Sequence, residues 1–280
     1  MTDIAHTDAL PTKPGGKLDL VHGGELEKPV SFMGLPILRR TSEQMVQLIE
    51  QHVGADRPLD IAFCNANTLL QAHDDQAYRQ TLASMTLLND GIGADIAARI
   101  LDGQPFAENL NGTDFVPYLL KHTTKPLRVY MLGAKPEVVS KAAEKWAKQF
   151  PRHNFCGHQH GYFDRKAIGD VLDNVNAAKP DLLLVAMGNP AQENFIMEHR
   201  GQLDVPVTMG VGALFDFTAQ IVPRAPIWMR KVKIEWLFRL SREPRRLVHR
   251  YTVGIGRFLY VCLKLRLANG RAGSFQEGAK

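Results

Sequence analysis

Residues 87–115, LLNDGIGADIAARILDGQPFAENLNGTDF, contain the pattern that decides the fold class. A short apolar run ends at Asp90, and the glycines of the following turn open a helical pattern. A strand, a polar turn and a helix in this order are typical of an open α/β sheet, which places its chemistry at the carboxyl ends of its strands. We therefore expect Asp90 at such an end, and Gly91 allows a ligand to approach the backbone closely.

The same succession recurs along the chain. Helical patterns separate the apolar runs that we expect to be strands, at residues 30–37, 59–64, 127–132, 181–187 and 205–209. This alternation predicts an α/β fold with a largely parallel, Rossmann-like sheet and helices on both faces. Polar or glycine-rich clusters follow the expected strands, at Asn65, Asp90, Gly133, 188–193 and 210–216. Because parallel strands end at one edge, these clusters should line one ligand crevice.

Composition narrows the class of protein. The chain has 280 residues, of which 45% are hydrophobic and 22% charged, as in ordinary globular proteins. Its three cysteines lie far apart, which argues against a disulfide framework or a zinc knuckle and fits a reducing cytoplasm. No window reaches the roughly 18 uncharged apolar residues of a membrane-spanning helix. We therefore expect a protein that is not integral to a membrane.

Charge is distributed unevenly along the chain. Residues 224–271 hold thirteen Lys and Arg against two Glu, a local net charge of +11, so the rest carries about −6 of the total of +5. We expect a flexible leader at residues 1–29, an α/β body at 30–225 and a basic amphipathic helical appendage at 226–280. Pro244 should separate two helices of this appendage.

From these residues alone the ligand stays open. The strand, glycine turn and helix around Gly133 could direct backbone N–H groups at a phosphate, but the third glycine of a dinucleotide fingerprint is absent. A nucleotide-dependent oxidoreductase on a Rossmann-like sheet is one alternative. A nucleic-acid binder that uses the Arg-rich tail is another, although the tail's aromatic and aliphatic residues at helical spacing favour a lipid interface.

The chain resembles the WecG/TagA/CpsF family of bacterial glycosyltransferases over about residues 34–258. The resemblance rests on Asn65 after a strand and on the turn DGIG at 90–93. It continues through the segments NGTD at 111–114, GNPAQE at 188–193, GVGALFD at 210–216, RAPIW at 224–228, EWLFR at 235–239 and EPRR at 243–246. Each match is weak alone, but many matches in order over two hundred residues are specific.

The resemblance implies an enzyme, an inverting, metal-independent glycosyltransferase without a cofactor. Such an enzyme moves a hexose from a UDP-sugar to a polyprenyl-diphosphate-linked acceptor, with a β-linkage, in bacterial surface or exopolysaccharide biosynthesis. It would be cytoplasmic and peripherally bound to the anionic inner face of the plasma membrane, with homo-oligomerisation left open and no nucleic acid as partner. The sequence agrees with metal independence, because no two aspartates are spaced as D-x-D. That spacing is the usual metal-binding clamp for a nucleotide diphosphate.

The resemblance also assigns residues. Asp90 matches the family's proposed base and Asn65 a polar residue of the same pocket, while Arg239 and Arg246 are candidates for bringing positive charge to the diphosphate. Candidate substrate contacts are Gly91, Gly133, Tyr162, Gln192, Glu193, Gly212 and Asp216, and no metal ligand is expected.

The candidate contacts also have simpler interpretations. Tyr162 could be a core aromatic residue, Glu193 a first-turn helix acid and Asp216 a turn cap. The family usually has Thr two positions before Asn65, where this chain has Phe63. That departure leaves the donor sugar open; in relatives it is usually N-acetylmannosamine.

Overall fold

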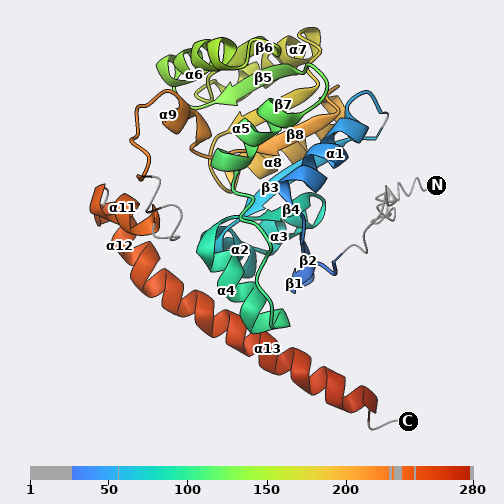
Figure 1. Ribbon diagram of the computed structural model, residues 1–280, viewed down its shortest axis with the longest axis vertical. Coiled ribbons are helices and arrows are strands. Elements are labelled where there is room, and N and C mark those ends of the chain that lie inside the picture. Colours follow the sequence, from blue (N-terminus) through green and yellow to red (C-terminus); the bar gives the residue numbers. More distant parts are fainter. Residues whose placement is uncertain (1–26, 56, 227–228, 230–234, 243, 278–280) are drawn as a thin grey trace, which may run out of the picture.

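The computed structural model describes residues 27–55, 57–226, 229, 235–242 and 244–277, so residues 1–26 of the expected leader lie outside the described residues. Its strands are β1 (Val30–Phe32), β2 (Leu35–Leu38), β3 (Leu59–Cys64), β4 (Thr86–Asn89), β5 (Arg128–Gly133), β6 (Asn154–Gln159), β7 (Leu182–Ala186) and β8 (Val207–Gly210). They form one eight-stranded sheet in the order β1-β2-β4-β3-β8-β7-β5-β6 (Figure 1). All neighbours are parallel except β1 and β2, which confirms the predicted α/β class.

The first strand differs from its prediction. Residues 30–37 do not form a single strand, because the chain turns at Met33 and Gly34, whose φ angles are 54° and 83°. Two successive residues with positive φ match the tight turn of a β-hairpin. The result is an antiparallel pair in which Val30 lies opposite Ile37, and it covers one edge of the parallel sheet.

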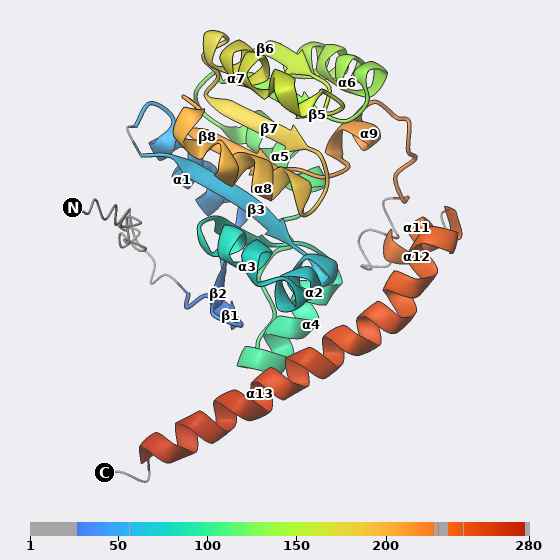
Figure 2. The ribbon, with the colours of Figure 1, turned by 180° about the vertical axis from the view of Figure 1, so that it is seen from behind.

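Helices cover both faces of the sheet (Figure 2). One face carries α1 (Ser42–His52), α5 (Gly112–His122), α6 (Pro136–Gln149) and α9 (Leu214–Thr218), which enclose one hydrophobic cluster. The other carries α2 (Ala66–Asp74), α3 (Gln76–Ala83), α4 (Gly91–Asp102), α7 (Ile168–Ala177) and α8 (Ala191–Glu198), which enclose the second. Side chains cap several helix starts; at α1, Thr41 and Gln44 form a reciprocal capping box.

The C-terminal part is helical. It consists of α11 (Glu235–Arg242), α12 (Pro244–His249), a π-helical turn (Arg250–Gly254) and the long α13 (Ile255–Glu277). Pro244 begins α12, so it separates two helices as predicted. Both ribbon views show α13 running past α4, with its last turns extending beyond the body (Figures 1 and 2).

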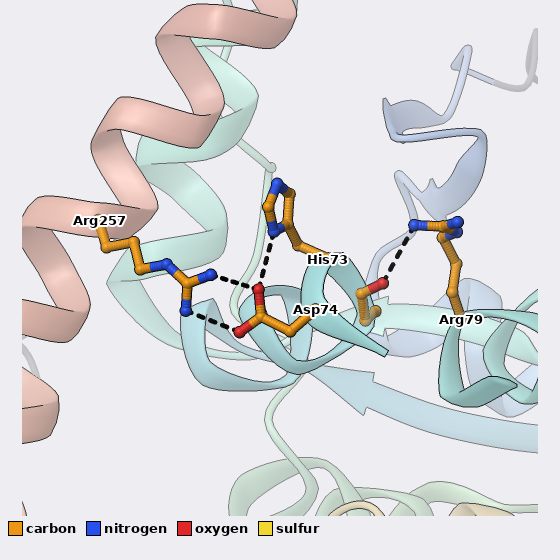
Figure 3. A network of polar contacts seen from close by, with 5 residues as sticks. His73, Asp74, Arg79 and Arg257 are labelled. Atoms are coloured by element: carbon orange, nitrogen blue, oxygen red, sulfur yellow. Dashed lines mark hydrogen bonds and ion pairs between the residues drawn. The ribbon is translucent and has the colours of Figure 1, made fainter. Parts of the chain in front are cut away.

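One face of α13 belongs to the core of the body. The rings of Phe258 and Phe32 are stacked with centroids 5.9 Å apart, and Val261 and Cys262 are buried beside them. At its margin, Arg257 makes a two-pronged ion pair with Asp74 at the end of α2 (Figure 3). These partners are half exposed, and surface ion pairs stabilise little. Apolar packing therefore holds α13 against the body.

Within the described residues, no helix is long and apolar enough to cross a membrane.

Candidate active site

The polar clusters predicted from the sequence meet at one edge of the sheet. The strands that precede them, β3, β4, β5, β7 and β8, are parallel and adjacent, so their carboxyl ends lie side by side. Cys64, the last residue of β3, pairs with Asn89, the last residue of β4. Asn65 and Asp90 therefore follow two neighbouring strands at the same level of the sheet.

Asn65 and Asp90 are in direct contact. The Asn65 side chain caps α2, because its Oδ1 accepts the backbone N–H groups of Asn67 at 3.0 Å and Thr68 at 3.2 Å. This fixes which end of the amide faces outward, and Nδ2 donates to Oδ2 of Asp90 at 3.1 Å. A half-buried carboxylate held by an amide at the end of a strand can accept a proton from a bound hydroxyl.

Close packing keeps the two helix starts together. Gly93 in the first turn of α4 lies against Ala66 in the first turn of α2, where an added Cβ would be 2.7 Å from the Ala66 Cβ. Real Cβ atoms do not approach so closely, so only glycine permits this spacing at position 93. Gly91 has a φ of 79°, and its N–H donates to Oδ1 of Asn109 at 2.7 Å.

Gln192 and Glu193 are buried beneath the edge, with 2% and 0% of their surface exposed. Oε1 of Gln192 accepts the backbone N–H groups of Gly188 at 3.2 Å and Gly212 at 2.9 Å. Its Nε2 donates to Oε1 of Glu193 at 2.7 Å. Gln192 thus ties the loop after β7 to the loop after β8, and Glu193 holds the amide in that orientation.

Glu193 receives further hydrogen bonds from two other elements. Asn189 Nδ2 donates to its Oε1 at 2.6 Å, and the Tyr78 hydroxyl of α3 donates to its Oε2 at 3.2 Å. Burial raises the pKa of Glu193, although these hydrogen bonds oppose the shift. Burial also raises the pKa of Cys64, and the charges of Glu193 and Asp90 add to that effect. Both carboxylates therefore lie within electrostatic reach of the Cys64 thiol.

The loop after β5 has a tightly constrained backbone. Gly133 has a φ of 130°, and a side chain there would overlap the carbonyl oxygen of Ala186 on β7. The N–H of Ala134 donates to that oxygen at 2.8 Å, so this donor is already used within the protein. Gly161 packs on Gly133 and leads into Tyr162, which is 71% exposed and is therefore not a core residue.

Asp216 lies in α9, beyond the end of β8. Burial raises its pKa, and the nearby positive charge of Lys135, at the start of α6, opposes that shift. The neighbouring Phe215 is fully buried, so its ring belongs to the core. Asp216 thus places a carboxyl group near the start of α6, which follows the carboxyl end of β5.

An ion pair fixes the segment that leads into the appendage. Nη2 of Arg224 lies 2.7 Å from Oδ2 of Asp114 in the first turn of α5, and its Nε lies 3.8 Å from Oε1 of Glu235 in α11. The side chains of Arg239 and Arg246 lie outside the described residues. Their position relative to the site therefore stays a prediction.

The model of the Glycosyl transferase WecG/TagA/CpsF family matches residues 30–272. The chain belongs to this family. A Bacillus spizizenii protein named N-acetylglucosaminyldiphosphoundecaprenol N-acetyl-beta-D-mannosaminyltransferase is 30% identical over 262 residues, 93% of this chain and 94% of that protein. Proteins of the same name from Bacillus subtilis and Staphylococcus aureus are each 31% identical, covering 71% and 85% of this chain and 75% and 93% of their own lengths.

Membership of the WecG/TagA/CpsF family confirms the resemblance seen in the sequence and makes this chain a glycosyltransferase. It favours this class over an oxidoreductase or a nucleic-acid binder. Among the residues that the structure describes, no group of three or more His, Cys, Asp or Glu side chains is placed to hold a metal ion.

The structure brings two of the predicted residues of this glycosyltransferase into contact and buries two others. Asn65 and Asp90 touch, while Gln192 and Glu193 are buried and bonded to protein groups. Phe63, at the position where the family usually has Thr, is buried against Phe115 and Gly112. Its ring therefore packs in the core and supports the first turn of α5.

Three contributors to the site of this glycosyltransferase were not predicted from the sequence. Tyr78 lies on a separate helix, and its polar partner is distant in sequence. Asn109 lies between the matched segments at 90–93 and 111–114 and belongs to neither, and only the fold brings it to Gly91. Arg224 stood within the matched segment RAPIW, so a signal existed, but its ion pair with Asp114 could not be anticipated.

Proposed function

We propose that this chain transfers N-acetylmannosamine from a UDP-sugar to N-acetylglucosamine carried on a polyprenyl diphosphate, with inversion, for a cell-envelope polysaccharide. The observation that carries the proposal is the Asn65–Asp90 pair at the carboxyl edge of the sheet. Relatives of nearly the same length, named for this acceptor and this sugar, support the choice of substrates.

The chemistry needs a proton acceptor beside the reacting hydroxyl. In the proposed reaction the acceptor hydroxyl attacks the anomeric carbon on the face opposite UDP, forming the new C–O bond as the bond to the diphosphate breaks. Asp90 takes the hydroxyl proton, and the Asn65 amide keeps the carboxylate in place. UDP leaves with the bonding electron pair, and its charge needs donors that are already oriented.

We propose that the diphosphate charge is met by protein cations and helix N-termini, without a metal ion. Arg239 and Arg246 of the appendage are the proposed cations. Gly91, Gly133, Tyr162, Gly212 and Asp216 are proposed donor contacts. Their positions at or shortly after the carboxyl ends of β4, β5, β6 and β8 support this proposal.

Gln192 and Glu193 are proposed to act on the donor through the loops that they hold. The burial of both side chains, the hydrogen bonds of Gln192 to Gly188 and Gly212, and the hydrogen bond of Gln192 to Glu193 support this role.

A donor screen with a matched variant pair tests the function. Purified protein would be incubated with a lipid-diphosphate N-acetylglucosamine analogue and a panel of UDP-sugars, and UDP release measured. UDP-N-acetylmannosamine should give the highest turnover, and Asp90→Asn should lower it by about 10²–10⁴-fold, the usual effect of general-base catalysis.

Asp75→Asn is the control, because Asp75 caps α3 and asparagine caps equally well. It should leave turnover unchanged. Normal turnover in Asp90→Asn would contradict the assignment of the base. Absence of UDP release with every donor would contradict the substrates.

We further propose that the appendage, residues 226–280, binds an anionic membrane surface while residues 30–225 form the catalytic body. The face of α13 that points away from the body exposes Tyr260, Leu263 and Leu267, which are 65%, 54% and 69% exposed. Large apolar side chains on a basic amphipathic helix suit insertion between lipid headgroups. Each Lys or Arg near an anionic leaflet adds on the order of 1 kcal/mol.

Liposome flotation tests this surface. The pair Leu263→Glu and Leu267→Glu should release the protein from anionic vesicles, and high salt should weaken binding of the unaltered chain through screening. Ile221→Glu, which changes an exposed apolar residue of the body, should leave binding unchanged. Full binding of the Leu263→Glu, Leu267→Glu variant would exclude the outer face of α13.

A further inference from the structure

The proposed base stands at a position where its side chain would ordinarily do something else. Asp90 is the residue that precedes α4, and aspartate there normally accepts a backbone N–H of the first helical turn. In this structure the Asp90 side chain makes no capping hydrogen bond. Its Oδ2 faces Nδ2 of Asn65 instead.

Another residue does the capping. The side chain of Asn109, from the loop between α4 and α5, accepts the N–H of Gly91, the first residue of α4, at 2.7 Å. A helix leaves its first N–H groups without partners inside the helix, so an acceptor supplied from elsewhere satisfies part of this need. Asn109 thereby anchors the peptide that joins Asp90 to α4.

The loop that carries Asn109 is anchored at the preceding residue, Glu108, by its backbone and by its side chain. The fully buried side chain of Asn89, directly before Asp90, donates to the backbone carbonyl of Glu108 at 2.7 Å. Oε2 of Glu108 in turn accepts the N–H of Ser42 at 2.8 Å and its hydroxyl at 2.6 Å, at the start of α1. The acceptor oxygen of Asn109 is therefore held at a fixed place beside the Asp90 turn.

We propose that Asn109 is a positioning residue for the transfer reaction, an anchor for the Asp90–Gly91 peptide that keeps the Asp90 carboxylate turned toward Asn65 and the acceptor hydroxyl. This inference rests on the proposed function, in which Asp90 accepts the proton. Without the Asn109 oxygen, the Gly91 N–H loses its acceptor and the turn that carries Asp90 is no longer fixed. The carboxylate would then move away from its place beside the substrate.

Two variants at one position separate this role from direct contact with substrate. Asn109→Ala removes the oxygen and should lower kcat by about 10–100-fold, the scale of a misplacement near 1 Å, while KM for the UDP-sugar stays unchanged. Asn109→Asp keeps an oxygen for the Gly91 N–H and should restore most of the loss. If Asn109→Asp is as defective as Asn109→Ala, the amide group acts on substrate and the positioning role is wrong.

Hydrogen exchange, and a control variant that loses the cap of another helix, show whether the effect of Asn109→Ala is local. The Gly91 amide should exchange faster in Asn109→Ala than in the unaltered chain or in Asn109→Asp. Thr41→Ala removes the cap of α1 and should lower the melting temperature by a similar amount without changing kcat. A matching fall of kcat in Thr41→Ala would mean that general destabilisation explains both results.

The decisive experiment is a double-mutant cycle with Asp90→Asn. If Asn109 acts through Asp90, Asn109→Ala should cause no further loss in the Asp90→Asn background, whereas independent effects would multiply. Multiplying losses would overturn the inference while leaving the proposed base intact. A fully active Asp90→Asn single variant would refute the proposed base itself, and the inference with it.

Discussion

Removing one hydroxyl from the buried cluster beneath the site should have a measurable and pH-dependent cost. The Tyr78 hydroxyl donates to Oε2 of Glu193 at 3.2 Å, whereas the amides of Asn189 and Gln192 both donate to Oε1. Tyr78→Phe keeps the ring in place and removes the donor to Oε2. We therefore expect a loss of stability without a change of packing.

The size of the loss follows from the geometry. A hydrogen bond to a charged group contributes about 1.5–3 kcal/mol. The distance of 3.2 Å is long for an O–H···O bond, which places this one near the lower end. For a chain of this size, about 1.5–2 kcal/mol corresponds to a fall in melting temperature of about 3–8 °C.

Protonation of Glu193 sets the sign of the pH dependence. Burial raises the pKa of Glu193, so ionising it costs the folded state stability as pH rises through that pKa. The cost of Tyr78→Phe should be larger above the raised pKa of Glu193, where the carboxylate is ionised, than below it. In Glu193→Gln, whose side chain is neutral and can accept both amides, Tyr78→Phe should cost less than in the unaltered chain.

Thermal and urea unfolding of the single and double variants measure these differences. Tyr130→Phe is the matched control, because it removes a hydroxyl from another buried tyrosine whose ring packs on Gly157. The reasoning is refuted if Tyr78→Phe costs no more than Tyr130→Phe at neutral pH, or if its cost is the same with and without the Glu193 charge.

Three further predictions concern metal, helix packing and acid stability. EDTA should leave turnover largely intact, and a strict need for Mg²⁺ or Mn²⁺ would contradict the proposed handling of the diphosphate. Gly93→Ala should lower kcat by about 10–100-fold, because its Cβ must push Ala66 and α2 away from α4; unchanged turnover would refute this. His153, buried between the Leu127 N–H and the Leu120 carbonyl, has a lowered pKa through burial, so stability should fall below about pH 6.5. In His153→Gln, urea unfolding should show a smaller loss of stability over the same fall in pH.

The sequence predicted the fold class because local signals and global architecture agree. Apolar runs alternate with helical patterns, and Pro244 marks a helix start where it was expected. The order of strands was beyond reach, since β3 pairs with β8 and the paired residues Leu59 and Val207 are far apart in sequence. The hairpin was missed because Met33 is an unusual residue for a tight turn.

The position of the site could be predicted from the sequence, but the hydrogen bonds that connect its residues could not. The sequence placed Asn65 and Asp90 after strands, and the structure makes those strands neighbours. It gave no reason to expect Gln192 and Glu193 to be buried, because polar residues in a first helical turn usually face solvent. Tyr78, which makes that burial tolerable, comes from a helix more than a hundred residues earlier.

The two acids near Cys64 are suited to different tasks by their surroundings. Glu193 is fully buried, accepts hydrogen bonds from three side chains and orients the amide that joins two loops. A group so enclosed cannot reach a sugar hydroxyl, and proton transfer requires hydrogen-bonding distance. Asp90 is half-buried at the edge, and its helix is capped by Asn109 instead. Of this pair, Asp90 is therefore the acid that a bound acceptor can meet, while Glu193 keeps the surrounding loops in register.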